Sequence, residues 1–243
     1  LNGGTFVGWN WKAGGSAASN TDGSITSQVS ANTDAGFSIV AWTAIGDNGT
    51  VGHGLDSTPE LIIAKPLGSG TNWYVQAPIV TAANQVLNLD STTAAFNPGV
   101  NHFNDTYPTS TVFSYGGYLG DDLTDDDKIA YCFHGVDGYS KVGSYTGLGA
   151  NGFPFVYTGF RPAWVLIKSK SGGYDWVLDD AARSPYNESN ATLYAEYTGG
   201  AYGIDFLSNG FKPRTAYGQY NLSGGIYLYF AFAENPFKYA NAR

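Results

Sequence analysis

The sequence of 243 residues has no methionine and only one cysteine, Cys132. A single cysteine excludes an intrachain disulfide, so we expect Cys132 to be a small apolar side chain buried in a strand. The missing methionine and the start at Leu1 lead us to expect a processed chain, an excised domain or part of a longer protein.

Charged residues are scarce as well, at 13% of the chain. Lysine, arginine and glutamate are good helix formers, so their scarcity argues against long helices. The 12 basic residues are outnumbered by 20 acidic ones, which gives a net charge of −8. An acidic surface repels polyanions, and the chain has no long apolar run. We therefore expect neither nucleic-acid binding nor membrane insertion.

Histidines are few, and His53, His102 and His134 do not have the spacing of zinc ligands. No serine stands in the glycine-flanked motif of a nucleophile elbow. We therefore predict that the protein has no catalytic residues and is not an enzyme.

The sequence is rich in aromatic residues, at 16%, and contains 33 glycines. Aromatic and β-branched residues favour strands, and glycine, asparagine, aspartate and serine favour tight turns. Turn signals recur at short intervals along the chain, which is typical of β-sandwiches and jelly rolls. The composition therefore predicts an all-β protein.

Three residue types recur at one offset of 103 positions, which indicates an internal duplication. The matched pairs are Pro59 and Pro162, Lys65 and Lys168, and Trp73 and Trp176.

The duplication predicts two tandem, related β-sandwich repeats of jelly-roll or lectin-like type, over residues 36–137 and 138–243. Residues 1–35 precede them as an N-terminal strand and an arm rich in Ser, Thr and Asn. The strand is of the type that closes each repeat, with Trp11 equivalent to Phe133 and Phe232. We expect the arm to add a strand to an open sheet edge of a neighbouring subunit.

Five aspartates crowd one predicted turn, and two interpretations of them stay open. Hard cations prefer several carboxylate oxygens, so the turn is a candidate Ca²⁺ site, although it lacks the regular spacing of known calcium loops. The alternative is a solvated acidic hairpin. The residues are Asp121, Asp122, Asp125, Asp126 and Asp127.

A second group of carboxylates, Asp175, Asp179, Asp180 and Glu188, raises the question of glycoside hydrolysis. That chemistry needs two carboxyl groups held about 5–9 Å apart in different environments. In the alternative interpretation, Arg183 forms a simple ion pair with Asp179, and these carboxylates have no catalytic role.

Aromatic side chains are the remaining candidates for ligand contact. Trp73, Trp164 and Trp176 fall in or beside predicted strands, so we expect core packing rather than sugar stacking. Tyrosines in loops are better placed, because an amphipathic ring binds a partner at low entropic cost. The candidate ligand-binding residues are Tyr107, Tyr115, Tyr118, Tyr186, Tyr202 and Tyr217.

Four stretches, residues 6–15, 159–168, 175–183 and 207–211, carry a resemblance to a known family. They are similar to a recurrent domain of unknown function in marine phage proteins of the virion and tail-fibre-like type. The resemblance implies a non-enzymatic protein of the virion surface, as a tail fibre, an appendage or a capsid decoration.

Its partners would be other virion proteins, further copies of itself and a host-surface glycan, bound with avidity through repetition. Two alternatives stay open. One is a secreted carbohydrate-binding or glycan-active β-sandwich protein, and the other is a coat protein without any ligand.

Overall fold

The computed structural model describes residues 8–68, 70–99, 102–117, 119, 126–195 and 203–235. The prediction of an all-β protein is confirmed, since the described residues form antiparallel sheets and two single 3₁₀ turns, η1 (Thr33–Ala35) and η2 (Gly149–Asn151). Neither of these short helices is long or apolar enough to cross a membrane.

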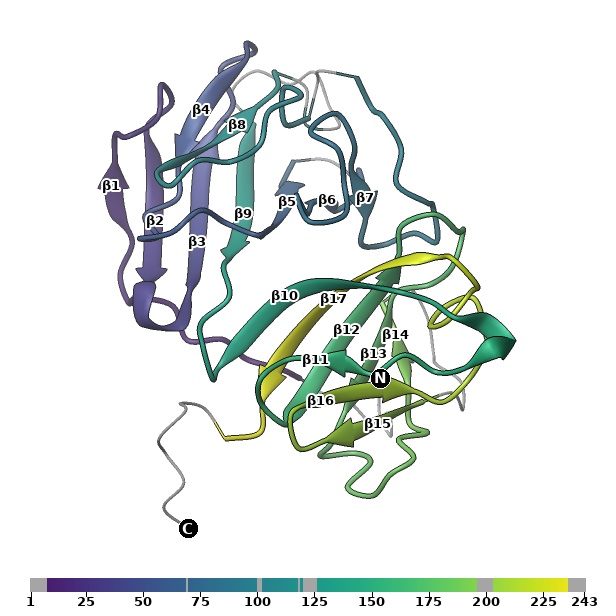
Figure 1. Cartoon of the computed structure of the whole chain (residues 1–243). Helices are drawn as coiled ribbons and strands as arrows, with labels where there is room; N and C mark the ends of the chain where they lie inside the picture. The colour runs from purple at the N-terminus through teal and green to yellow at the C-terminus, as the bar shows by residue number, and fades with distance from the viewer. Residues whose placement is uncertain are drawn as a thin grey trace, which may run out of the picture.

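The first half of the molecule contains a seven-stranded and a two-stranded sheet (Figure 1). The larger sheet has the order β1-β2-β3-β9-β5-β6-β7, and β4 pairs with β8 in the smaller one. The strands are β1 (Ala18–Asn20), β2 (Ser27–Asn32), β3 (Phe37–Thr43), β4 (Gly49–Gly52), β5 (Leu61–Pro66), β6 (Tyr74–Gln76), β7 (Leu87–Asn88), β8 (Val112–Tyr115) and β9 (Asp127–Phe133).

The second half contains a five-stranded sheet of order β10-β17-β12-β13-β14 and a three-stranded sheet of order β11-β16-β15. The strands are β10 (Ser140–Thr146), β11 (Val156–Tyr157), β12 (Pro162–Ser169), β13 (Val177–Asp180), β14 (Leu193–Tyr194), β15 (Ile204–Leu207), β16 (Gly210–Pro213) and β17 (Ile226–Ala233).

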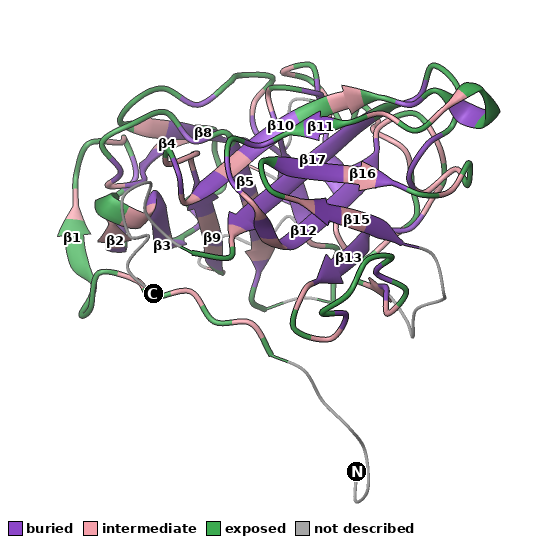
Figure 2. Ribbon diagram, turned by 60° about the horizontal axis from the view of Figure 1, so that its bottom comes forward, coloured by how far each residue is buried: buried purple, intermediate pink, exposed green. Residues whose placement is uncertain are grey.

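Alternation along the central strands divides the interior into three apolar cores. In β9, Ala130 and Cys132 face the small sheet of the first half, whereas Phe133 faces the second half. In β17, Phe230 faces the first half and Tyr229 faces the three-stranded sheet. The sheets therefore stack as four layers, with the middle core shared by both halves. Figure 2 shows β12 and β17 buried along most of their length.

The five-stranded sheet matches β3-β9-β5-β6-β7 of the seven-stranded sheet in strand order and in register. Residue Ile63 pairs with Val75 in the first half, and Leu166 pairs with Leu178 in the second, so both partners move by the same 103 positions. Likewise Leu61 and Trp164 pair with Phe133 and Phe232, the corresponding residues of the closing strands.

The N-terminal region differs from the prediction in part. Residues 8–14 form no strand, because they pair with no neighbour, and Phe6 and Val7 lie outside the described residues. Trp9 and Trp11 instead pack onto the middle core of their own chain. The expected arm contains β1 and β2, which pair within the molecule, with β2 lying beside β3. In the described residues, the expected arm therefore pairs with the sheet of its own chain.

Candidate binding cleft

A cleft of about 600 Å³ opens between the two halves, at the margin of the shared core. The wall of the first half contains Phe37, Ile39, Ile63, Trp73, Leu89, Tyr131 and Phe133. The opposite wall contains Trp164, Leu166, Leu178, Leu193, Tyr194, Ala195 and Phe230, and the N-terminal segment adds Trp9, Asn10 and Trp11.

Three nearly parallel rings form the wall of the first half. Tyr131 stacks on Trp73 at 6.2 Å with an interplanar angle of 25°, and on Phe37 at 6.5 Å with an angle of 3°. Pairing of β9 with β3 and β5 holds the central ring, since Tyr131 lies opposite Ile39 on one side and Ile63 on the other. The central ring is therefore held by a paired strand, and Trp73 directly precedes β6.

The other wall is built from rings in edge contact. Trp164 lies 6.4 Å from Trp9 and 5.6 Å from Trp11, both in T-shaped geometry. Trp11 also contacts Phe133 at 6.2 Å and Phe232 at 5.6 Å, the two residues that the sequence equates with it. The Nε1 donor of Trp164 is buried and has no hydrogen-bond partner among the described residues.

Among the residues that the structure describes, the lining of the cleft has no carboxylate, amine or imidazole. Their polar groups are the Asn10 amide, the Tyr131 and Tyr194 hydroxyls and the indole N–H groups. A site of this size and polarity is typical of small-ligand pockets, which are mostly apolar with a few orienting polar groups. The cleft is suited to hold the flat apolar face of an uncharged ring.

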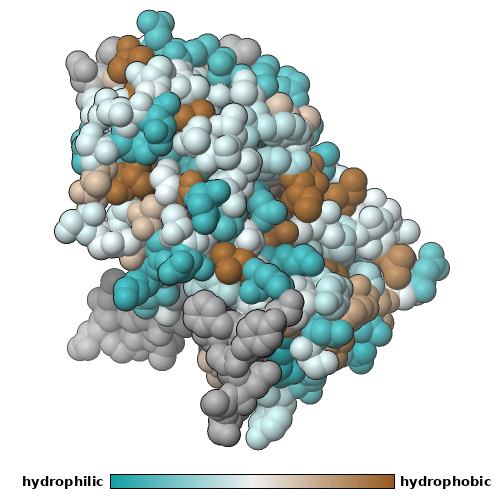
Figure 3. Space-filling view, turned by 60° about the vertical axis from the view of Figure 1, so that its left-hand side comes forward, coloured by the Kyte–Doolittle hydropathy of each residue, from teal (hydrophilic) through white to brown (hydrophobic). Residues whose placement is uncertain are grey.

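The predicted ligand-binding tyrosines do not converge on this cleft. Tyr186 and Tyr217 are exposed at 83% and 53% in separate loops. Tyr107, exposed at 42%, donates its hydroxyl to Thr81 O at 2.9 Å. Its ring lines a second groove of about 460 Å³ beside Val142. On the face shown in Figure 3, hydrophobic residues likewise form separate small patches.

The expectation for Tyr115 is wrong, because this residue is 1% exposed. Its ring packs edge-on against Trp42 at 5.8 Å in the core of the first half. A strand that faces the core, rather than a loop, carries it. Tyr118 and Tyr202 lie outside the described residues.

In the acidic turn, Asp121, Asp122 and Asp125 lie outside the described residues. Asp126 forms an ion pair with Lys128 at 2.8 Å, and Asp127 accepts a hydrogen bond from the Thr43 hydroxyl at 2.9 Å. Within the described ranges, no three acidic, histidine or cysteine side chains gather as metal ligands.

The second carboxylate group is divided between two environments. Asp179 is buried and accepts hydrogen bonds from the hydroxyls of Tyr220 and Thr192, both at 2.8 Å, and of Ser189 at 3.3 Å. Desolvation by this burial raises the pKa of Asp179 to about 6, although the three hydroxyls oppose the shift.

Arg183 pairs with Asp180, at 2.5 Å, and not with Asp179 as the sequence suggested. Asp175 is buried near Gln219, at 3.4 Å, and Glu188 is exposed. No two of these carboxylates line the cleft, so the geometry that glycoside hydrolysis needs is missing there.

Trp164 and Trp176 are core residues, as expected. Trp73 is half-buried and lines the cleft, so its expected role is wrong. Cys132 is buried in β9, and burial raises its pKa to about 12, which keeps the thiol protonated.

A family model matches residues 1–236, and its description is "Domain of unknown function (DUF7483)". The chain belongs to this family. Neither the curated proteins nor the solved structures contain a match to the chain. The family fits the expected domain of unknown function, and it assigns no ligand to the cleft.

Proposed function

We propose that the chain is a non-enzymatic attachment module on the surface of a phage particle, in a tail fibre, an appendage or a capsid decoration. Its task is to bind a host-surface glycan and to contact other virion proteins. The aromatic cleft is the observation that carries this proposal.

The lining of the cleft supports a sugar ring as the ligand. A pyranose has one face of C–H groups, which matches an aromatic ring in shape and polarity. The stacked rings of Trp73 and Tyr131 provide that surface. Asn10 and the hydroxyls of Tyr131 and Tyr194 provide the few polar groups that orient a ligand.

The fold supports a second part of the proposal, that the two halves are tandem repeats of one ancestral β-sandwich. The shared register between β5–β6 and β12–β13 favours it. So does the matching strand order of the larger sheets. A module that arose by duplication is consistent with a particle that gains avidity from many weak contacts.

A glycan array probed with the wild-type protein and with Trp73→Ala tests the attachment role. We expect the wild type to bind one class of glycan and Trp73→Ala to lose that binding. Tyr186→Ala is the matched control, because this exposed ring lies outside the cleft lining. Binding lost in Tyr186→Ala and kept in Trp73→Ala would move the site to the loops.

The location on a particle needs a separate test. Mass spectrometry of purified particles, with antibody labelling in electron micrographs, should place the protein on the outer surface. A protein found only in the soluble fraction of the lysate would overturn the virion role and favour the secreted carbohydrate-binding alternative.

A further inference from the structure

The two larger sheets end in strands of unequal length. Three of their four edge strands are short: β1 has three residues, and β7 and β14 have two each. The fourth, β10, has seven residues. Short edge strands protect a sheet from pairing with another chain, so β10 is the exception among the described edge strands of these two sheets.

In the first half, the strand that corresponds to β10 is paired with a further strand along its outer edge. Its strand β3 occupies the place of β10, since Phe37 pairs with Phe133 as Ser140 pairs with Phe232. The outer edge of β3 is covered by β2, which pairs with five of its residues. Among the described residues no strand covers the outer edge of β10, and residues 141–146 make no backbone hydrogen bond beyond the ladder to β17.

The side chains of β10 do not block its edge. Its one charged residue is Lys141. A lysine on an edge strand discourages pairing with another chain when its charge projects over the open edge. Here the Lys141 ammonium lies 5.3 Å from the centre of the Tyr157 ring and 3.3 Å from Tyr157 O. This contact turns the lysine toward β11. Ser144 and Thr146 are exposed and uncharged.

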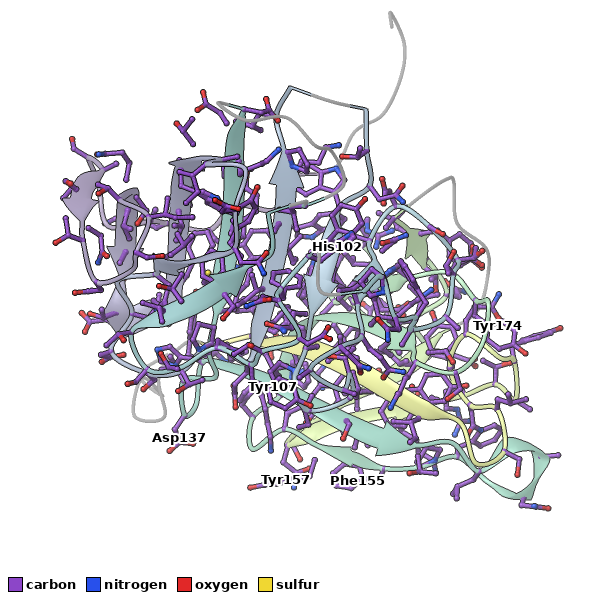
Figure 4. All side chains as sticks on the ribbon, turned by 90° about the horizontal axis from the view of Figure 1, so that it is seen from above. His102, Tyr107, Asp137, Phe155, Tyr157 and Tyr174 are labelled. Carbon is purple, nitrogen blue, oxygen red and sulfur yellow. The ribbon has the colours of Figure 1, made fainter. Side chains whose placement is uncertain are left out.

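Apolar side chains flank the edge. Ile79 and Tyr107, together with Val142 of β10 itself, line the groove of about 460 Å³ beside it. Phe155 and Tyr157 are exposed on the side of β11, and Figure 4 shows both at one margin of the molecule. A strand added to β10 would therefore bury apolar surface as well as satisfy backbone groups.

We propose that β10 is the self-association edge of the protein, where a second copy of the chain pairs its own β10 in antiparallel fashion about a two-fold axis. The length of β10 favours a second copy as the partner. Among the described residues, no other edge strand of the larger sheets is long enough to pair with all seven residues of β10. The charge of β10 is compatible with this pairing, because the strand has no acidic residue although the chain has a net charge of −8. The two five-stranded sheets would join into one sheet with an isologous interface.

Sedimentation of the wild-type protein over roughly 1–100 µM tests this assignment, since that range spans the affinities of weak dimers. We expect a concentration-dependent dimer. In Ser144→Lys/Thr146→Lys, lysines at exposed positions of the edge should weaken the dimer at least about tenfold by charge repulsion. The monomer should keep its circular dichroism spectrum, because both positions are exposed.

The matched control is Ala18→Lys/Ser19→Lys, which adds the same charge to exposed positions of the short edge strand β1. This control should keep the dimer. Amide exchange adds a direct readout, in which residues 140–146 gain protection as the concentration rises. A wild type that stays monomeric throughout, or a dimer that the β10 lysines leave unchanged, would overturn the proposal. It would leave the attachment role untouched, because the cleft does not include the edge.

Discussion

Trp176 donates its indole N–H to the backbone carbonyl of Asn88 at 2.7 Å and so joins the two halves of the molecule. Lys168 makes a second connection, from its ammonium to Thr92 O at 3.0 Å and Ser91 O at 3.3 Å. Of their counterparts 103 positions earlier, Lys65 donates to Thr71 O within its own half, and Trp73 lines the cleft.

The different roles of the two tryptophans predict different costs of truncation. Trp176 is 1% exposed, so Trp176→Ala should lower the free energy of unfolding by about 3–5 kcal/mol. Trp73→Ala, at a half-buried position, should cost less than about half as much. Urea denaturation of the two variants measures both values. Equal losses would contradict the assignment of Trp73 to the cleft.

Lys168→Met should loosen the contact between the two halves of the molecule while the sheets of each half stay folded. The substitution keeps the length of the side chain and removes the donor from the carbonyls of Ser91, Thr92 and Tyr174. Buried acceptors left without a donor cost about 1–3 kcal/mol each. We expect faster amide exchange in residues 88–96 of Lys168→Met than of the wild type, and equal exchange rates would contradict this connection.

The buried Asp179 predicts a pH dependence of a defined sign. Its pKa is about 6 in the folded state against 3.8 in the unfolded one. Between these values the folded protein therefore binds more protons than the unfolded chain. Its contribution to stability is complete below about pH 4 and is lost as the pH rises through 6, by on the order of 2–3 kcal/mol.

Comparison of Asp179→Asn with the wild type isolates this effect from other titrations. The loss of stability between pH 4 and 7 should be smaller in Asp179→Asn by that amount. Glu188→Gln makes the same chemical change at an exposed position and should follow the wild type. A wild type and an Asp179→Asn variant with parallel pH profiles would show that burial does not perturb this carboxyl.

Calcium should leave the stability of the protein unchanged. Asp126 is paired with Lys128 and Asp127 is bonded to Thr43, so both are engaged without a cation. A bound ion at a hundredfold excess over its Kd would add about 2.7 kcal/mol. Thermal melts in calcium and in a chelator measure this directly, and a higher Tm in calcium would restore the metal interpretation of the turn.

The sequence predicted the all-β class because strand alternation and turn residues are local signals. The common offset of 103 also indicated that related segments recur in both halves, and the strand pairs Ile63–Val75 and Leu166–Leu178 keep that offset. These features follow from the alternation of side chains between the two faces of a strand, which the sequence of each strand shows by itself.

The cleft could not be predicted in the same way, because its walls come from segments far apart in the chain. Trp9 and Trp164 meet only after the two halves pack together. The common offset of 103 misled the prediction for Trp73, since residues at matched positions need not have equivalent neighbours. Tyr115 was misplaced for a related reason, because a loop-like composition surrounds a strand that faces the core.

Calorimetric titration with the best glycan from the array tests the central claim most directly. If the cleft is the binding site, Trp73→Ala should bind that glycan at least about tenfold more weakly, a loss of about 1.4 kcal/mol in stacking. Tyr186→Ala should match the wild type. Equal affinity of Trp73→Ala and the wild type would contradict the account of the aromatic cleft.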